Sequence, residues 1–158
     1  MSSDKYKEIA TNLNYNNKAF INGKFINSKS DKYFKTINPA TGEVITEITD
    51  CNSGDVDLAV KSARDSFNSG VWSKSSPEFR KEVLLKLANL LREKTDEMAV
   101  IESLDSGKTI NDCLNEVGNE VPNFFQWYGE LIDKTFGKVV PTGQDVSSFI
   151  VKEPIGVV

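Results

Sequence analysis

An acidic row is the first feature of this sequence that could do chemistry. Asp112, Glu116 and Glu120 are spaced four residues apart, which places their carboxylates on one face of an α-helix. Like charges at this spacing repel each other and are tolerated mainly in water, so the commoner explanation is a solvated helix face. The functional alternative is a patch that attracts a cationic group. The sequence alone leaves both alternatives open.

Nucleophilic and metal chemistry find little support among the other residues. The chain has no histidine, so hydrolase triads and zinc centres would need unusual substitutes for the imidazole. Cys51 and Cys113 are far apart in the sequence and lie beside carboxylates, which disfavour a reactive thiolate. We therefore expect two reduced thiols, neither of them a nucleophile, and no disulfide framework.

Residues 106–109 (Ser-Gly-Lys-Thr) look like the end of a phosphate-binding loop. That motif needs a second glycine five residues before Gly107, and Glu102 stands there instead. A helix C-terminus explains the segment better, because Gly107 suits a left-handed conformation and Lys108 suits the negative end of the helix dipole. No G-x-G-x-x-G pattern occurs either, so the sequence gives no sign of a nucleotide loop.

Length and composition indicate an ordinary globular protein. The chain has 158 residues, of which 39% are hydrophobic and 27% charged, and its net charge is −4. A negative net charge gives no field to attract nucleic acid or anionic lipid. No run approaches the ~18 apolar residues of a membrane span, and the first 18 residues lack a signal-peptide core. We expect a cytoplasmic protein that binds neither nucleic acid nor membrane.

Strand patterns dominate the first third of the chain. Residues 20–25 place Asn22-Gly23 between two apolar pairs, which is typical of a tight hairpin. Alternating side chains over 33–37 and 43–48, joined by a Pro- and Gly-containing turn, predict a second strand pair.

Three helices should follow these strands. Apolar spacing predicts the first over 54–68, and Ser76-Pro77 should begin a long second helix that breaks near Thr95 and ends at Ser106-Gly107. The third should run from Thr109 or Asp112 to Lys134, with a kink at Pro122 because proline removes a backbone donor.

The two ends of the chain carry separate expectations. Residues 1–17 are polar and aperiodic, which predicts a flexible N-terminal arm or a short marginal helix. Residues 138–152 should form a β-hairpin, and the apolar run 154–158 should begin a buried strand. Such a strand needs neighbours on both edges, so we expect an N-terminal part of something larger, with an α/β fold.

Five segments together resemble the N-terminal third of the aldehyde dehydrogenase superfamily. They are residues 20–25 (Phe-Ile-Asn-Gly-Lys-Phe), 36–43 (Thr-Ile-Asn-Pro-Ala-Thr-Gly-Glu), 104–108 (Leu-Asp-Ser-Gly-Lys), Trp127-Tyr128 and 153–158 (Glu-Pro-Ile-Gly-Val-Val). Each motif alone is weak, but the five occur in the family's order. In that family a Pro-Trp-Asn segment at the cofactor site follows next. The resemblance therefore implies an N-terminal fragment, with 18–136 as part of the cofactor-binding domain.

The resemblance implies an NAD(P)-dependent oxidation of an aldehyde to a carboxylic acid. In the family a cysteine thiolate attacks the carbonyl, hydride leaves to nicotinamide, and a glutamate-activated water hydrolyses the thioester. These residues and the nucleotide loops belong to the part of the family beyond this stretch. We therefore expect no catalytic and no cofactor-binding residue in this chain, no NAD or NADP bound by it alone, and no activity by itself.

Site residues carried over from the family are few. The resemblance implies a monovalent cation near the backbone carbonyls of Thr36 and Ile37 and the carboxylate of Asp105. It places Glu120 near the mouth of the substrate tunnel, from which we expect an aldehyde bearing an amine or amide. It makes the hairpin over 137–153 an oligomerisation arm, so the expected partners are the rest of the enzyme chain and further copies of it.

Two other functions remain as alternatives. The first is a stand-alone assembly or binding module that uses the edge of the 138–152 hairpin. The apolar run 154–158 speaks against it, because a self-sufficient module should have polar or covered strand ends. The second, an isolated nicotinamide-binding domain, is disfavoured by the missing Gly-rich loop.

Overall fold

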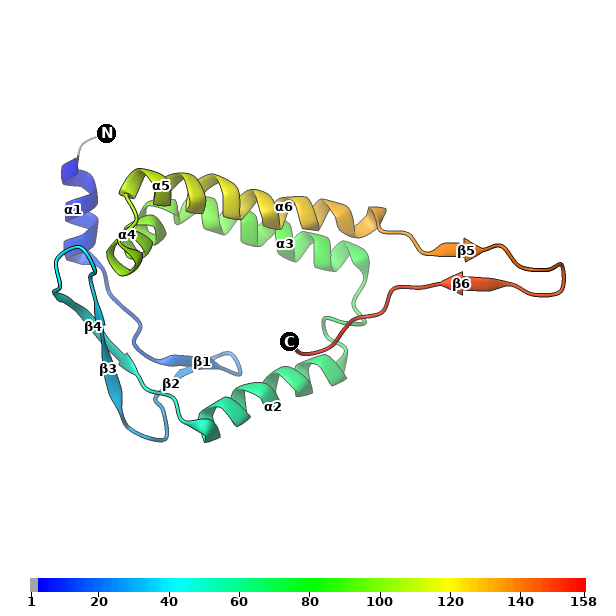
Figure 1. Cartoon of the computed structure of the whole chain (residues 1–158), viewed down its shortest axis with the longest axis horizontal. Helices are drawn as coiled ribbons and strands as arrows, with labels where there is room; N and C mark the ends of the chain where they lie inside the picture. The colour runs from blue at the N-terminus through cyan, green and yellow to red at the C-terminus, as the bar shows by residue number, and fades with distance from the viewer. Residues whose placement is uncertain (1–2) are drawn as a thin grey trace.

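The computed structural model describes residues 3–158 and contains helices and three small antiparallel hairpins (Figure 1). In chain order the elements are α1 (Ser3–Asn12), β1 (Ala19–Ile21), β2 (Lys24–Ile26), β3 (Tyr33–Ile37), β4 (Val44–Thr49), α2 (Ser53–Ser69), α3 (Pro77–Glu93), α4 (Thr95–Ser106), α5 (Ile110–Asn115), the π-helical turn η1 (Glu116–Glu120), α6 (Val121–Leu131), the 3₁₀ turn η2 (Ile132–Lys134), β5 (Lys138–Val140) and β6 (Ser148–Ile150). The predicted α/β class is confirmed.

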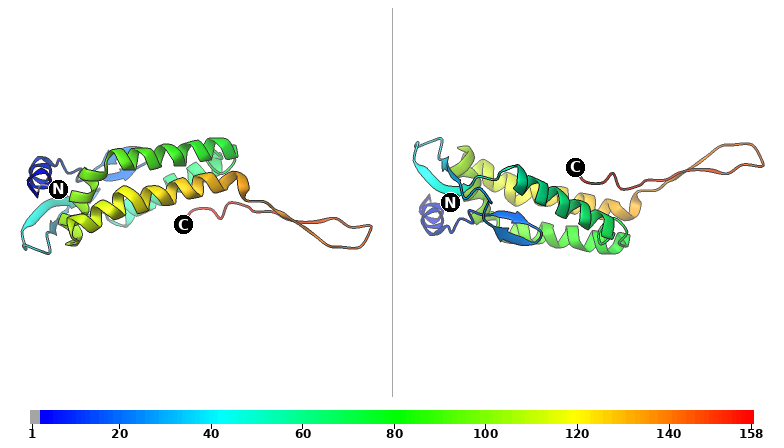
Figure 2. Two further views of the ribbon diagram at one scale, coloured as in Figure 1. Left: turned by 90° about the horizontal axis from the view of Figure 1, so that it is seen from above. Right: turned by 90° about the horizontal axis from the view of Figure 1, so that it is seen from below.

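The elements form an open arrangement rather than a single layered sheet. Helices α3 and α6 lie side by side along one edge, and α2 runs along the opposite edge (Figures 1 and 2). Helix α1 and the β3–β4 hairpin lie at one end, and the β5–β6 hairpin projects from the other (Figure 1). No helix within residues 3–158 is long and apolar enough to cross a membrane.

Both predicted strand pairs of the first third are confirmed. Asn22 and Gly23 have φ values of 52° and 73°, as the two-residue turn between β1 and β2 requires. In the second pair the backbone N–H of Gly42 donates to the carbonyl of Asn38 at 2.8 Å and closes the turn. The β3–β4 register shifts between Thr36 and Ile37, so the regular ladder is interrupted there.

Asp55 links helix α2 to the loop that precedes β3 through hydrogen bonds. Its carboxylate accepts hydrogen bonds from the Ser28 hydroxyl at 2.5 Å and from the backbone N–H groups of Asn52 at 3.0 Å and Lys29 at 3.1 Å. The Asn52 side chain accepts in return from the Asp55 backbone N–H, which completes a capping box. The Ser28 hydroxyl and these N–H groups hold the pKa of Asp55 below its ordinary value, although the residue is only 1% exposed.

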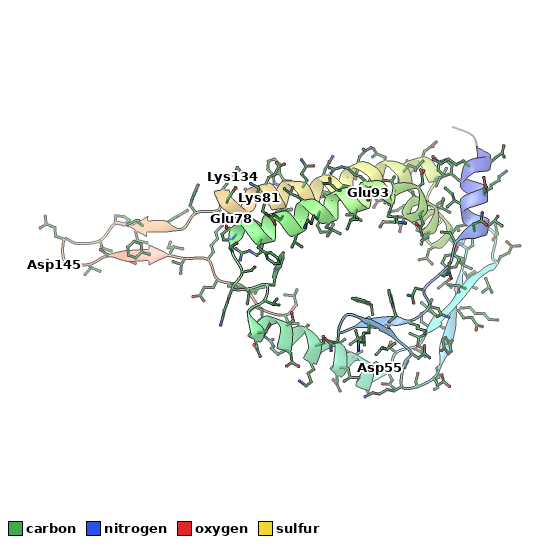
Figure 3. All side chains as sticks on the ribbon, turned by 180° about the vertical axis from the view of Figure 1, so that it is seen from behind. Asp55, Glu78, Lys81, Glu93, Lys134 and Asp145 are labelled. Atoms are coloured by element: carbon green, nitrogen blue, oxygen red, sulfur yellow. The ribbon has the colours of Figure 1, made fainter. Side chains whose placement is uncertain are left out.

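Helices α3 and α6 pack closely against each other. A Cβ placed on Gly129 of α6 would lie 3.1 Å from the Cβ of Leu84 in α3, so the two backbones approach closely. At the end of the pair, Lys81 of α3 bonds Asp133 at 2.7 Å, and Figure 3 shows Lys81 and Lys134 close together there. Hydrogen bonds from Lys134 and Lys81 lower the pKa of Asp133 to about 2.

The predicted helix boundaries are mostly confirmed. Ser76 caps α3 and Gly70 ends α2 in the left-handed region. The break expected near Thr95 falls at Lys94, which separates α3 from α4. The irregularity expected at Pro122 takes the form of the π-helical turn η1, in which the Val121 N–H bonds the carbonyl of Glu116, five residues back.

At the N-terminal end of the chain the structure adopts one of the two predicted alternatives, and at the C-terminal end it differs from the prediction. Residues 3–12 adopt the short helix rather than the flexible arm, and Lys5 of α1 forms an ion pair with Asp96 of α4; Met1 and Ser2 lie outside the described residues. The strand expected over 154–158 is not formed, because a strand needs a partner for its backbone hydrogen bonds and none lies beside it within residues 3–158. Ile155 is 91% exposed.

Replacing Asp55 by Asn should lower stability in a pH-dependent way. A depressed folded-state pKa adds stability that is fully present above the ordinary Asp pKa, near 4, and is lost as pH falls through the folded-state value. At neutral pH we expect the variant to lower the unfolding midpoint by roughly 4–8 °C. The difference should shrink as pH falls below about 4.

Thermal unfolding followed by circular dichroism at several pH values measures this effect. Asp57→Asn is the matched control, because Asp57 is an exposed carboxylate on the same helix. A difference between wild type and Asp55→Asn that stays constant down to about pH 3 would contradict the assignment.

Candidate functional site

A groove on the outer side of η1 and α6 holds the candidate site. Its volume is about 500 Å³ and its lining residues are Glu120, Asn123, Phe124, Trp127 and Tyr128. The three aromatic side chains are 62%, 64% and 59% exposed, in that order. Aromatic faces attract cations and apolar groups alike, so the groove combines an apolar wall with one carboxylate.

The Glu120 carboxylate is held on one side only. Oε1 accepts a hydrogen bond from the Asn115 side chain at 2.8 Å, whereas Oε2 has no partner among the described residues. The Asn119 amide donates to Oδ1 of Asn115 at 3.2 Å, which leaves the Asn115 amide nitrogen to face Glu120. One carboxylate oxygen therefore stays available for a ligand.

The acidic row does not act as one patch. Lys108 lies 2.7 Å from Oε2 of Glu116 and 3.3 Å from Oε1 of Glu102, and these two carboxylates, Glu116 first, raise the pKa of Lys108. Asp112 instead accepts from the Thr109 hydroxyl at 2.7 Å. Of the row, Glu120 is the residue that lines the groove of η1 and α6. Gly107 lies in the left-handed region and ends α4, which confirms the helix end predicted for residues 106–109.

The residues expected near a monovalent cation come from two neighbouring segments. Thr36 and Ile37 flank the register shift in β3, and Asp105 lies exposed in the last turn of α4. A Cβ on Gly107, which has φ 76°, would lie 2.9 Å from Cγ of Pro39, so the loop after α4 packs on the β3–β4 turn. Carbonyl and carboxylate oxygens are the donors that a hard cation prefers, so the donor set fits such an ion.

The two cysteines lie in different environments. Cys51 is exposed, Cys113 is buried, and both are free thiols. Burial and the nearby Glu102 raise the pKa of Cys113, which disfavours its thiolate. Residues 3–158 contain no group of three or more His, Cys, Asp or Glu side chains that could hold a metal ion.

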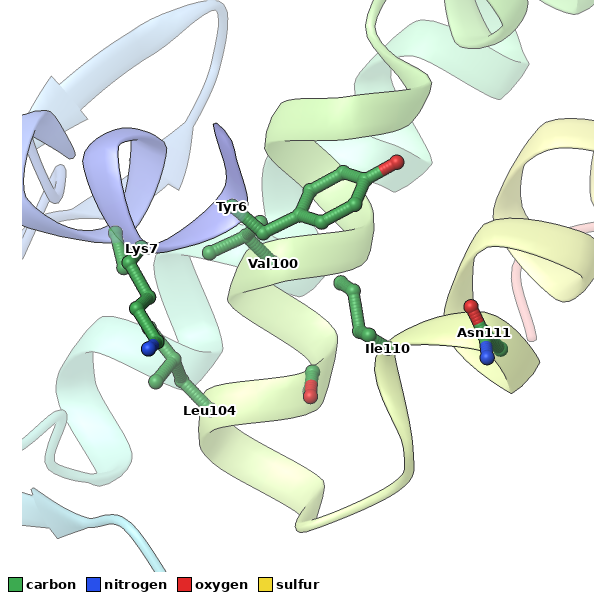
Figure 4. Close-up of a pocket in the computed structure, with 8 residues that line it drawn as sticks. Tyr6, Lys7, Val100, Leu104, Ile110 and Asn111 are labelled. Carbon is green, nitrogen blue, oxygen red and sulfur yellow. The ribbon is translucent and has the colours of Figure 1, made fainter. Parts of the chain in front are cut away.

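Sequence reasoning missed a second hollow, which lies under helix α1. It has a volume of about 380 Å³ and is drawn in Figure 4. Apolar side chains and a few polar ones from α1, α4 and α5 line it, among them Tyr6, Lys7, Val100, Leu104, Ile110 and Asn111. No sequence signal could have found it, because it exists only where α1 docks onto segments far along the chain.

Sequence comparison identifies the relatives of this chain. The model described as "Aldehyde dehydrogenase family" matches residues 25–158. The aminoacetaldehyde dehydrogenase of Pseudomonas aeruginosa is 42% identical over 158 residues, which cover 100% of this chain and 32% of that protein. The NADP/NAD-dependent aldehyde dehydrogenase PuuC of Escherichia coli is 37% identical over 153 residues, covering 97% of this chain and 31% of its own length.

Structural comparison agrees with the sequences. A mutant of P. syringae AldA indole-3-acetaldehyde dehydrogenase, in complex with NAD+ and IAA, superposes with a TM-score of 0.94 at 33% identity, over 99% of this chain and 32% of that one. The aldehyde dehydrogenase KauB of Pseudomonas aeruginosa also superposes with a TM-score of 0.94 at 33% identity, over 99% of this chain and 32% of that one. The chain thus spans about a third of the length of these relatives. It belongs to the aldehyde dehydrogenase family.

Proposed function

We propose that this chain serves as part of an NAD(P)-dependent aldehyde dehydrogenase, which oxidises an aldehyde to a carboxylic acid. The similarity along the whole chain carries this proposal, since 42% identity extends over all 158 residues to a protein named aminoacetaldehyde dehydrogenase. The chain spans about a third of that relative. Its buried Cys113 is not suited to attack a carbonyl, which supports the expectation that the chain alone is inactive.

The dinucleotide, when bound, accepts the hydride that leaves the substrate. The residues of this chain do not fit a dinucleotide site, because the sequence lacks a Gly-rich loop and residues 106–109 are engaged as a helix end. We therefore assign no step through the cofactor to them. The role proposed for this part is support of the substrate passage and of assembly.

We propose the groove of η1 and α6 as the part that selects the substrate. Glu120 offers a free carboxylate oxygen, and Phe124, Trp127 and Tyr128 offer aromatic faces to an ammonium group. The name of the aminoacetaldehyde dehydrogenase relative supports a substrate that carries an amine. The proposed substrate class is an aldehyde bearing an amine or amide.

We further propose a monovalent cation at the carbonyls of Thr36 and Ile37 and the carboxylate of Asp105. The register shift between Thr36 and Ile37 supports it, because carbonyls outside a regular ladder are available as ligands. The contact between Gly107 and Pro39 brings the two segments together.

The β5–β6 hairpin is the proposed contact between copies of the enzyme. In it Val139 faces Phe149 across the two strands, and both side chains are exposed. A two-stranded hairpin leaves both outer edges unpaired, and apolar side chains on such edges favour pairing with another strand. A stand-alone docking module would use the same edge, so oligomeric state and activity must be measured together.

Two further assignments complete the proposal. The remainder of the longer enzyme is the proposed cover for exposed apolar side chains outside the groove, such as that of Ile155. The cytoplasm is the proposed compartment, supported by two free thiols, which are usual in a reducing compartment.

Assay of the full-length enzyme tests the activity and the role of Glu120 together. The wild type should reduce NAD or NADP with aldehydes, whereas this chain alone should not. Glu120→Gln should lower the kcat/KM ratio of an ω-aminoaldehyde to an n-alkanal of equal length by about tenfold, which equals ~1.4 kcal/mol of lost charge interaction. Glu93→Gln removes an exposed carboxylate outside the groove and is the matched control.

Three results would count against these proposals. Absence of aldehyde oxidation by the full-length enzyme would overturn the activity. Turnover by this chain alone would overturn its supporting role. An unchanged substrate ratio in Glu120→Gln would overturn the substrate class.

Asp105→Asn should abolish a specific response to monovalent cations. If the proposed site binds potassium, exchanging Tris for potassium at constant ionic strength should raise the unfolding midpoint of the full-length enzyme by about 1–2 °C at a tenfold excess over Kd. The variant should show no such shift, while Asp145→Asn in the β5–β6 turn should behave as wild type. Equal shifts in the wild type and Asp105→Asn would exclude this residue as a ligand.

Phe149→Asp should reduce the oligomeric state of the full-length enzyme. A carboxylate on the exposed hairpin face adds charge where apolar side chains should meet. Light scattering coupled to size-exclusion chromatography measures the mass. Gln144→Asp adds the same charge in the turn between the strands and should leave the mass unchanged. An unaltered mass in Phe149→Asp would remove the hairpin from the interface.

A further inference from the structure

The helix that carries the groove becomes π-helical for one turn, and that turn ends at Glu120. Elsewhere in the described part of the chain the long helices are α-helical. A π turn is rare, and it appears mostly as a single insertion at functional sites. Its position directly before the groove therefore needs a physical reason.

The π turn changes which side chain lies one turn below Glu120. In an uninterrupted α-helix this neighbour would be Glu116, four residues back, and the two carboxylates would repel each other. Across a π turn the residue five positions back takes that place, and it is Asn115. The observed bond from the Asn115 amide to Oε1 of Glu120, at 2.8 Å, is this contact.

Packing on the inner side fixes the turn in place. A Cβ on Gly118 would lie 2.7 Å from Cγ2 of Thr95, so the turn presses against the start of α4. Val117 and Pro122 are buried beside it, and Pro122 has no N–H to donate to a helical carbonyl. The inner contacts thus hold the backbone, while Asn115 and Glu120 remain on the exposed side.

A second amide fixes the orientation of the first. Asn119 donates to Oδ1 of Asn115 at 3.2 Å, so the Asn115 side chain presents its NH₂ group to the carboxylate. Glu120 is the only charged residue among the five that line the groove. The position of this one carboxylate therefore decides where a positive charge is stabilised in the groove.

We propose that Asn115 is a positioning residue, which holds Glu120 through the π turn and thereby sets the preference of the groove for cationic aldehydes. This inference rests on the proposed function of the groove. Asn115 itself does not line the groove. It acts by fixing Oε1 of Glu120, so that a ligand need not spend free energy on ordering that side chain.

Substrate selectivity of the full-length enzyme tests the proposal. Asn115→Leu removes the amide at similar volume and should lower the kcat/KM ratio of an ω-aminoaldehyde to an n-alkanal by about three- to tenfold, at most the loss expected when the Glu120 charge itself is removed. The change should appear as a higher KM for the aminoaldehyde, while the kcat for that substrate stays within about twofold of the wild-type value. Asn115→Ser is a second, smaller variant in case leucine disturbs the helix.

Two controls separate positioning from general damage. Asn111→Leu makes the same change on α5 outside the π turn, and it should leave the ratio unchanged. In a background of Glu120→Gln, Asn115→Leu should lower the ratio no further, because its target charge is gone.

The outcomes distinguish this inference from the function on which it rests. If Glu120→Gln changes the ratio and both Asn115 variants leave it unchanged, the positioning role alone is overturned. Equal losses of kcat for both aldehydes would also overturn it, because they indicate structural damage. If Glu120→Gln itself leaves the ratio unchanged, the substrate class fails and the positioning role fails with it.

Discussion

The close approach of α3 and α6 is the constraint on which the rest of this structure depends. Gly129 permits the approach, since a Cβ there would meet Leu84 at 3.1 Å. Arg92 reinforces it from α3 by donating to Asn123 at 3.0 Å and Gln126 at 2.7 Å on the other helix. With one face of α6 packed on α3, the aromatic side chains on the rest of its surface remain exposed and line the groove. Packing thus decides which residues are free to bind a ligand.

The same constraint explains why the irregular positions cluster. Helix α3 ends at Glu93, and the chain turns at Lys94 so that Thr95 meets Gly118 of η1. A helix that must pass this contact and then accommodate Pro122 cannot keep the regular pattern of four-residue hydrogen bonds. The π turn absorbs both demands within five residues. A local adjustment forced by packing is therefore also what brings Asn115 under Glu120.

Sequence alone predicted the features that are set by local chemistry. Asn22 and Gly23 form the hairpin turn and Gly107 ends α4 because these residues tolerate positive φ values. Ser76 begins α3 because its side chain accepts a hydrogen bond from a backbone N–H three residues on. Both effects act within a few residues. The sequence did not predict the docking of α1, which relies on α4, or the form of the irregularity before Pro122. The link between Asn115 and Glu120 was missed for the same reason, because the α-helical spacing assumed for the acidic row pairs Glu120 with Glu116.

The three members of the acidic row differ in what surrounds their carboxylates. Asp112 and Glu116 are engaged by Thr109 and Lys108 and belong to the surface chemistry of the α4–α5 connection. Glu120 differs because it shares a groove with exposed aromatic rings. Soluble proteins tolerate single exposed apolar residues, but a group of aromatic side chains around one carboxylate marks a binding surface. Charge alone did not separate these residues, whereas the apolar surface beside the charge does.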